Sequence, residues 1–121
     1  MTIETYLERL NGRDLDGCLS MFADGATVSF RDKRAEGRDA IRQWHEERFS
    51  NHIEVRLDGA VETAGESISA PVRLKSDRLE GRRLAELPAT ITIQTKDGLI
   101  ATMKIEARIG AALKGLFGFG S

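Results

Sequence analysis

Residues 3–30 read IETYLERLNGRDLDGCLSMFADGATVSF, and the apolar spacing of this stretch decides the fold class. Apolar side chains first recur at i, i+3, i+4 and i+7, which predicts an amphipathic helix that ends at Gly12 in a left-handed cap. Asp14 is placed to cap a second helix, which the Asp24-Gly25 turn signal would end. The apolar faces of these two helices would be Ile3, Tyr6, Leu7 and Leu10, and Leu15, Cys18, Leu19 and Phe22.

The chain that follows predicts a short strand, a turn and a third helix. Residues 26–30 contain β-branched side chains and predict the strand, and the charged residues 31–37 predict the turn. The third helix is expected from about residue 38 to residue 49, with Asp39 in its first turn, where the helix dipole favours a negative charge. Its apolar face would hold Ile41, Trp44, His45 and Phe49.

From residue 51 onward the period changes from 3.6 to 2, which predicts four long strands. Hairpins are expected at residues 80–82 and at Asp97-Gly98, where both residues tolerate a positive φ. The connections are too short for helical crossovers, so the order should be antiparallel. The sequence therefore predicts an α+β fold with a strongly curved, mainly antiparallel sheet wrapped around three helices. The expected inward faces include Ile53, Val55 and Leu57; Ile68, Ala70, Val72 and Leu74; and Leu99, Ala101, Met103, Ile105 and Ala107.

Composition excludes several classes of function. The 121 residues carry 18 basic and 19 acidic side chains, so the net charge of −1 argues against general nucleic-acid binding. No segment is apolar for long enough to span a bilayer, and the first residues do not form a signal peptide. The lone Cys18 excludes an intrachain disulfide and a cysteine-based zinc site, so a cytoplasmic protein is expected. His45 and His52 are not spaced as a metal pair, and no phosphate-binding or nucleophile motif is present, so neither metal nor cofactor is expected.

The domain should cover residues 1–109, followed by a glycine-rich apolar extension over residues 110–121. Glycine at that density disfavours a helix. The extension would fold back over the sheet or lie partly disordered; alternatively, it would close a cavity or contact a second subunit.

Three segments carry a resemblance to a known family. YLERLNGRDLDGCLSMFADGATV (6–28), EGRDAIRQWHEERF (36–49) and TKDGLIATMKI (95–105) resemble the Δ5-3-ketosteroid isomerase family. That family belongs to the wider nuclear transport factor 2-like (SnoaL-like) superfamily. The resemblance implies a cystatin-like cone of three helices in a curved sheet, an apolar pocket for a small hydrophobic molecule, and a homodimer.

The resemblance does not carry over the family's catalytic set. Steroid isomerisation needs an Asp base, a Tyr donor and a protonated Asp. The tyrosine corresponds to Tyr6, but the base corresponds to Phe30, and the protonated acid to Thr90, or to Ile91 if one gap is allowed. None of these replacements is an acid. Steroid isomerisation by the family mechanism is therefore not expected.

Tyr6 and His45 are the candidate catalytic residues, because the family places a second aromatic donor, bonded to its tyrosine, at the position of His45. The pair would serve general acid–base chemistry of an isomerase, cyclase or hydrolase, with phenolate character on Tyr6 or with His45 as the base. The alternative is a hydrogen bond within the core of a non-catalytic ligand-binding or dimerising accessory domain. Candidate ligand-binding residues are Phe30, Trp44, Met103 and Ile105, which would shape the cavity, and Thr90, which would add a polar contact.

Three further features have open interpretations. Asp32 could act as an acid or base, but its basic neighbours favour a solvated turn. A homodimer would form through the outer face of the sheet, which would present Ile91 and Ile93 if Thr90 and Thr92 point inward. The basic residues of the 73–83 hairpin could attract an anion, but interleaved acids favour an exposed face; these residues are Arg73, Lys75, Arg78, Arg82 and Arg83.

Overall fold

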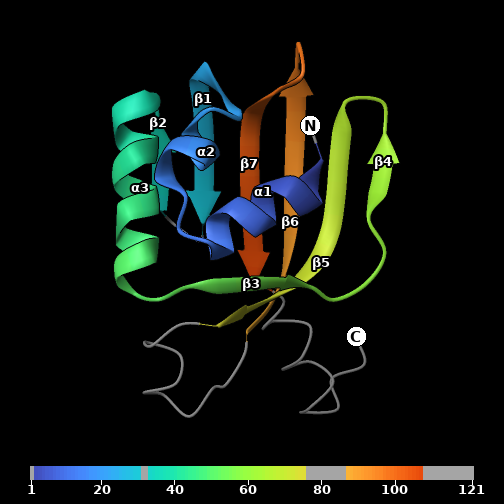
Figure 1. Ribbon diagram of the computed structural model, residues 1–121. Helices are drawn as coiled ribbons and strands as arrows, with labels where there is room; N and C mark the ends of the chain where they lie inside the picture. Colours follow the sequence, from blue (N-terminus) through green and yellow to red (C-terminus); the bar gives the residue numbers. More distant parts are fainter. Residues whose placement is uncertain (1, 31–32, 76–86, 108–121) are drawn as a thin grey trace.

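The computed structural model describes residues 2–30, 33–75 and 87–107 (Figure 1). Asp32, the predicted hairpin at residues 80–82 and the extension over residues 110–121 lie outside these ranges. The elements are α1 (Ile3–Asn11), α2 (Leu15–Leu19), β1 (Phe22–Phe30), β2 (Lys33–Glu36), α3 (Arg38–Ser50), β3 (Glu54–Leu57), β4 (Glu62–Ala64), β5 (Ser67–Lys75), β6 (Leu87–Lys96) and β7 (Leu99–Ala107).

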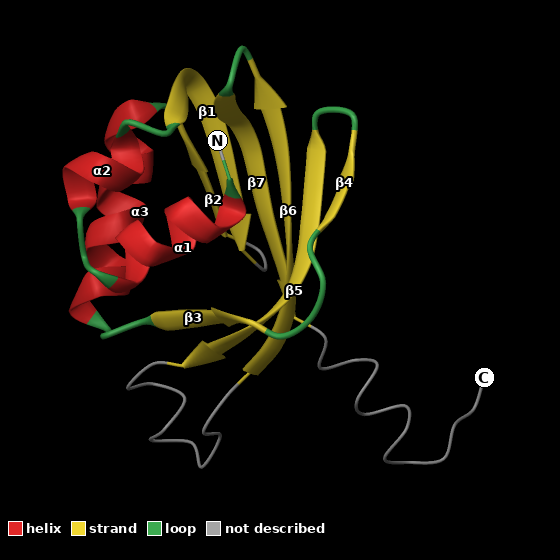
Figure 2. Ribbon diagram, turned by 45° about the vertical axis from the view of Figure 1, so that its right-hand side comes forward, coloured by secondary structure: helices red, strands yellow, loops and turns green. Residues whose placement is uncertain are grey.

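The strands form one curved sheet, and the three helices lie on its concave side (Figures 1 and 2). Its order is β2-β1-β7-β6-β5-β3, with β4 paired to β5. All described neighbours are antiparallel except β1 and β7, which are parallel, so the sheet is mixed. The α+β prediction is confirmed. In the described ranges, no helix has the length and apolar character needed to cross a membrane.

The first helix forms where its periodicity predicts, but it ends differently. Thr2 caps α1 by accepting a hydrogen bond from the backbone N–H of Thr5, at 3.2 Å. The C-terminal cap, Gly12, has a right-handed φ of −80°, and Arg13 instead takes the left-handed conformation, with φ of 57°. The predicted left-handed glycine was therefore wrong. The turn is displaced by one residue onto a side chain that accepts this conformation less readily.

The second helix is shorter than predicted, because β1 begins early. Asp14 caps α2 as expected by accepting from the Gly17 N–H at 3.0 Å. Phe22 is buried as the first residue of β1, and the Asp24-Gly25 pair lies within the strand instead of ending the helix. The register between β1 and β7 shifts between Phe22 and Thr27, and this irregularity accommodates the turn-forming pair.

Two short strands were missed because neither has an apolar alternation. The charged segment expected to be a turn forms β2, which pairs with β1 at the sheet edge. Only Ala35 of this strand is buried. Charged side chains are typical of edge strands, since they discourage pairing with other chains. All three residues of β4 are exposed, so no inward face marks this strand in the sequence.

The alternation of β7 is interrupted by a bulge. Gln94 pairs with Thr102 and Thr95 pairs with Ile100, which leaves Ala101 as the additional residue. The predicted inward positions of Leu99 and Ala101 were therefore wrong. Ile100 is buried instead, and Leu99 is 38% exposed. The hairpin before the strand is confirmed, with positive φ at Asp97 (54°) and Gly98 (79°).

In the neighbouring strands β5 and β6, the apolar residues face the helices. Ala70, Val72 and Leu74 of β5 are buried, as predicted. Ile91 and Ile93 of β6 are also buried, whereas Thr90 and Thr92 alternate with them and are half-buried on the opposite face. The premise that the threonines point inward and expose the isoleucines was therefore wrong. Burying branched apolar side chains under the helices is more favourable.

Asn11 joins the end of α1 to β3. Its Nδ2 donates to the carbonyl of Val55, and its Oδ1 accepts from the Val55 N–H, both at 2.8 Å. The side-chain amide thus gives Val55 the two hydrogen-bond partners that a neighbouring strand would otherwise provide. Val55 is buried, but Leu57, predicted on the same face, is 37% exposed at the end of β3.

Replacing Asn11 by alanine should lower the free energy of unfolding by about 1–3 kcal/mol, because both backbone groups of Val55 lose their partner. Urea unfolding of the purified protein measures this loss. Gln43→Ala, at an exposed site on α3, is the matched control and should change stability by less than about 0.5 kcal/mol. Equal losses of unfolding free energy in both variants would contradict a stabilising role of the Asn11 side chain.

Candidate functional site

Tyr6 and His45 meet between α1 and α3. Tyr6 lies on the buried face of α1, and His45 lies on the buried face of α3. The Tyr6 Oη and the His45 Nε2 are 2.8 Å apart, and both residues are 0% exposed. Helices α1 and α3 thus place a phenol and an imidazole that are 39 residues apart in sequence in direct hydrogen-bond contact.

The second nitrogen of His45 fixes the direction of this hydrogen bond. His45 Nδ1 lies 2.8 Å from the carbonyl oxygen of Ile41, one turn earlier in α3. A carbonyl can only accept, so Nδ1 carries the proton of the neutral imidazole. Nε2 then has a free lone pair and accepts the hydrogen bond that the Tyr6 hydroxyl donates. One oxygen lone pair of Tyr6 remains available for another donor.

Burial keeps both members of the pair neutral. It raises the pKa of Tyr6 well above 10.0, and the nearby Cys18 adds to this rise. Burial lowers the pKa of His45 from 6.5; the hydrogen bond to Ile41 opposes this change, and the positive charge of Arg48 reinforces it. Burial also raises the pKa of the Cys18 thiol to about 12. These directions disfavour phenolate character on Tyr6 and leave the neutral imidazole as the base of the pair.

Aromatic rings surround the imidazole. The rings of Tyr6, Phe22, Trp44 and Phe49 all approach His45 edge to face, with centroid distances from 5.0 to 6.1 Å. Such a setting contains little water, so the hydrogen bond between Tyr6 and His45 is stronger than it would be in solvent.

Trp44 lies next to this pair with an unmet hydrogen-bonding group. The residue is 6% exposed, and its Nε1 is buried with no hydrogen-bond partner in the ranges that the structure describes. The Arg48 guanidinium lies 5.2 Å from the centroid of the indole and 3.3 Å from the Glu47 carboxylate. Sequence analysis did not identify Arg48 as buried. The signal was its spacing of four residues from Trp44, on the same helix face.

The other predicted ligand-binding residues lie on both faces of the sheet. Met103 and Ile105 of β7 are buried towards the helices, and Ile105 pairs in register with the half-buried Phe30 of β1. Thr90 pairs with Pro71 and Glu106 on the opposite face. The structure thus brings Phe30, Met103 and Ile105 to the helix side, but it does not bring Thr90 to Tyr6 and His45.

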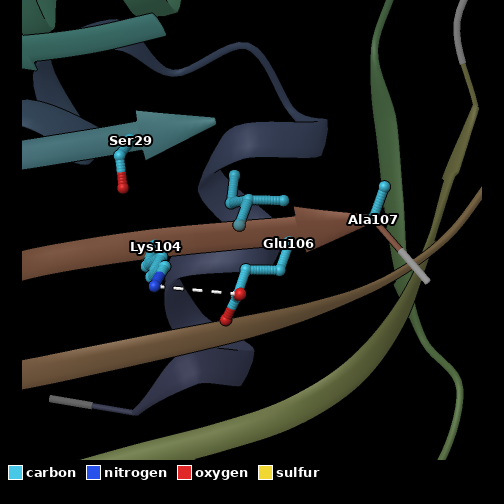
Figure 3. Close-up of a pocket in the computed structure, with 5 residues that line it drawn as sticks. Ser29, Lys104, Glu106 and Ala107 are labelled. Atoms are coloured by element: carbon cyan, nitrogen blue, oxygen red, sulfur yellow. Dashed lines mark ion pairs between the residues drawn. The ribbon is translucent and has the colours of Figure 1, made fainter. Parts of the chain in front are cut away.

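A hollow of about 320 Å³ opens at the end of β1 and β7 (Figure 3). Figure 3 shows Lys104 and Glu106 of β7 as an ion pair, with 3.8 Å between Nζ and Oε2. Ile105 is the one predicted ligand-binding residue in its lining, and neither Tyr6 nor His45 contributes to it. This hollow is therefore separate from the paired rings. Its lining is Ser29, Lys104, Ile105, Glu106 and Ala107.

No set of three or more His, Cys, Asp or Glu side chains is arranged to hold a metal ion within residues 2–30, 33–75 and 87–107. The groups that Tyr6, His45 and Trp44 present are a neutral phenol, a neutral imidazole and an indole N–H.

Comparisons with known proteins identify the relatives of this arrangement. A family model described as a SnoaL-like domain matches residues 3–103. No curated protein matches the chain. Among solved structures, a proposed polyketide cyclase from Sinorhizobium meliloti superposes with a TM-score of 0.75 at 21% identity, over 86% of this chain and 92% of that one.

Two further solved structures share this fold. An epoxide hydrolase/cyclase-like enzyme of pyran ring formation in the polyether salinomycin gives a TM-score of 0.74 at 19% identity, over 87% of this chain and 86% of that one. A proposed ketosteroid isomerase from Kribbella flavida gives a TM-score of 0.72 at 17% identity, over 86% of this chain and 73% of that one. At these identities the similarity shows a common nuclear transport factor 2-like fold.

Proposed function

Because this chain belongs to the SnoaL-like domain family, we propose that it binds a small apolar molecule beside Tyr6 and His45 and performs general acid–base chemistry on it. The observation that carries this proposal is the 2.8 Å contact between the Tyr6 hydroxyl and the unprotonated Nε2 of His45. The Ile41 carbonyl holds the imidazole in the tautomer that can accept a proton.

The pair would act as a proton relay. A ligand hydroxyl, a water molecule or an acidic C–H gives its proton to Tyr6 Oη while the phenol proton passes to His45 Nε2. The products are a ligand anion and an imidazolium, and Tyr6 stays neutral throughout. Return of the proton at another atom of the ligand completes an isomerisation. Attack of the activated oxygen on an epoxide carbon instead forms one C–O bond and breaks the epoxide C–O bond, and the resulting alkoxide takes the proton back from the imidazolium through Tyr6; the product is a closed ring when the oxygen belongs to the ligand and a diol when it belongs to water.

The proposed reaction differs from steroid isomerisation. By the family resemblance, the two acids correspond to Phe30 and to Thr90, or Ile91 if one gap is allowed, and none of these side chains can take their roles. A missing base alone lowers a rate by about 10²- to 10⁴-fold. The similar structures include proteins described as a polyketide cyclase and an epoxide hydrolase/cyclase-like enzyme. Ring closure and epoxide opening are therefore the first reactions to assay.

A ligand search tests the proposal. Small apolar molecules are screened by thermal shift, and molecules that co-purify with the protein are identified by mass spectrometry. Ligands that stabilise the protein are then incubated with it and analysed for products. We expect at least one to be converted, and conversion should be lost in Tyr6→Phe. Conversion that persists in both Tyr6→Phe and His45→Ala would contradict the relay.

A second candidate is a non-catalytic ligand-binding or dimerising accessory domain of the same fold. The full burial of Tyr6 and His45 and the partners on both imidazole nitrogens favour this alternative. A bound ligand would then be recovered unchanged after long incubation. The family resemblance also predicts pairing of two copies in either proposal, although Ile91 and Ile93 are buried and do not form the interface. Sedimentation equilibrium should then give twice the chain mass.

A further inference from the structure

The indole N–H of Trp44 has no hydrogen-bond acceptor among the described residues. Its Nε1 is buried without a hydrogen-bond partner among the described residues, in a side chain that is 94% removed from solvent. Buried polar groups are almost always paired, because leaving one unpaired forfeits its hydration without replacement. A buried tryptophan usually satisfies this N–H within its own protein. An acceptor supplied by a bound molecule would satisfy it here.

The position of Trp44 connects it to the proposed site. It precedes His45 on α3, and the two rings are in edge-to-face contact with centroids 5.0 Å apart. Tyr6 and Trp44 both contact the imidazole, but the hydrogen-bonding groups that they leave unused are opposite. The Tyr6 oxygen has a lone pair left, since its proton is given to His45, whereas Trp44 has a proton left.

We propose that Trp44 Nε1 donates a hydrogen bond to an oxygen of the ligand and so selects apolar molecules that carry an acceptor, such as a carbonyl or an ether. This inference rests on the proposed function, since it concerns the ligand of the same site. It adds that the ligand needs two distinct groups, one that releases a proton towards Tyr6 and one that accepts from Trp44. A pure hydrocarbon has no acceptor and leaves the indole N–H unpaired.

A matched pair of probes tests this selection. The ketone 2-tetralone and the hydrocarbon tetralin have nearly the same size and shape and differ in one carbonyl. Their Kd values are measured by calorimetry on the whole protein and on Trp44→Phe. In the variant, the ketone-to-hydrocarbon affinity ratio should fall by about 5- to 150-fold, because the donor is gone and the hydrocarbon loses no hydrogen bond.

The single tryptophan allows a direct spectroscopic test of the same bond. Ultraviolet resonance Raman spectra report hydrogen bonding at the indole N–H, and every tryptophan band belongs to Trp44. The free protein should show an unbonded N–H, 2-tetralone should shift the band to the bonded position, and tetralin should not. If Trp44→Phe is poorly folded by circular dichroism, β-(3-benzothienyl)alanine at position 44 replaces the N–H by sulfur in a ring of the same shape.

The outcomes separate this inference from the proposed function. A bonded N–H in the free protein would overturn the inference, and so would an affinity ratio that is unchanged in both position-44 variants. Either result leaves the Tyr6–His45 relay standing. Failure of the relay is seen separately, as turnover that persists in both Tyr6→Phe and His45→Ala. If neither tetralin nor 2-tetralone binds, both the apolar pocket and the role of Trp44 are wrong.

Discussion

Tyr6→Phe should lower turnover of an identified substrate by about 10²- to 10⁴-fold, the usual loss when a positioned proton-transfer group is removed. The substitution deletes one oxygen and leaves the ring, which also packs against Phe22 with centroids 5.6 Å apart. His45 then has no route to the ligand proton, since its accepting nitrogen faces the site of the lost hydroxyl. The loss should appear in kcat, measured by product formation under saturating substrate.

Phe22→Leu is the matched control for this variant. Phe22 touches both Tyr6 and His45 but takes no part in proton transfer. Leucine should cost stability through lost packing, of the order of 1 kcal/mol, while changing kcat by less than about tenfold. If both variants lose turnover equally, the site depends on its packing, and the hydroxyl of Tyr6 has no special role.

Acidification below pH 6.5 should destabilise the protein through His45. Burial lowers the folded-state pKa of His45 below the value of 6.5 that holds in the unfolded chain. The unfolded state therefore binds a proton first, and stability falls as the pH falls from 6.5 to the folded-state pKa. One proton sets an upper limit of about 1.4 kcal/mol per pH unit on this slope. Urea unfolding between pH 8 and pH 4.5 measures it.

Two variants assign this pH dependence. His45→Gln keeps an acceptor for the Tyr6 hydroxyl but cannot titrate, so its contribution to the acid slope should vanish. His52→Asn changes an exposed histidine at a left-handed position, φ of 53°, which asparagine tolerates. It should retain the slope of the original protein. An unchanged slope in His45→Gln would place the acid sensitivity on other groups.

The sequence carries much of the information about the helices and the paired rings. An apolar face at 3.6-residue spacing leaves few choices for α1 and α3, so Tyr6 and His45 were identified as inward-facing side chains. Their contact followed from the family resemblance, because the separation of two helices in space is not encoded in the periodicity of either one. Strands with a continuous apolar alternation, such as β5, could be predicted from the sequence equally well.

Other features depend on contacts between distant segments. The strand β2 forms because β1 offers a free edge, although Lys33 and Arg34 resemble a turn. The additional residue Ala101 changes the inward face of β7, and only pairing with β6 reveals it. The unmet N–H of Trp44 is likewise invisible in the sequence, since it reflects which acceptors fail to reach the indole.

The two hydrogen bonds between the Asn11 side chain and Val55 connect the edge strand β3 to the helix that carries Tyr6. Asn11 ends the same short helix that holds Tyr6, and helices transmit displacement along their axis with little compliance. A displacement of β3 would therefore move α1, and with it the Tyr6 oxygen of the proposed relay. Substitutions in β3 are thus expected to change the rate of the proposed relay, although they contact neither the Tyr6 nor the His45 ring.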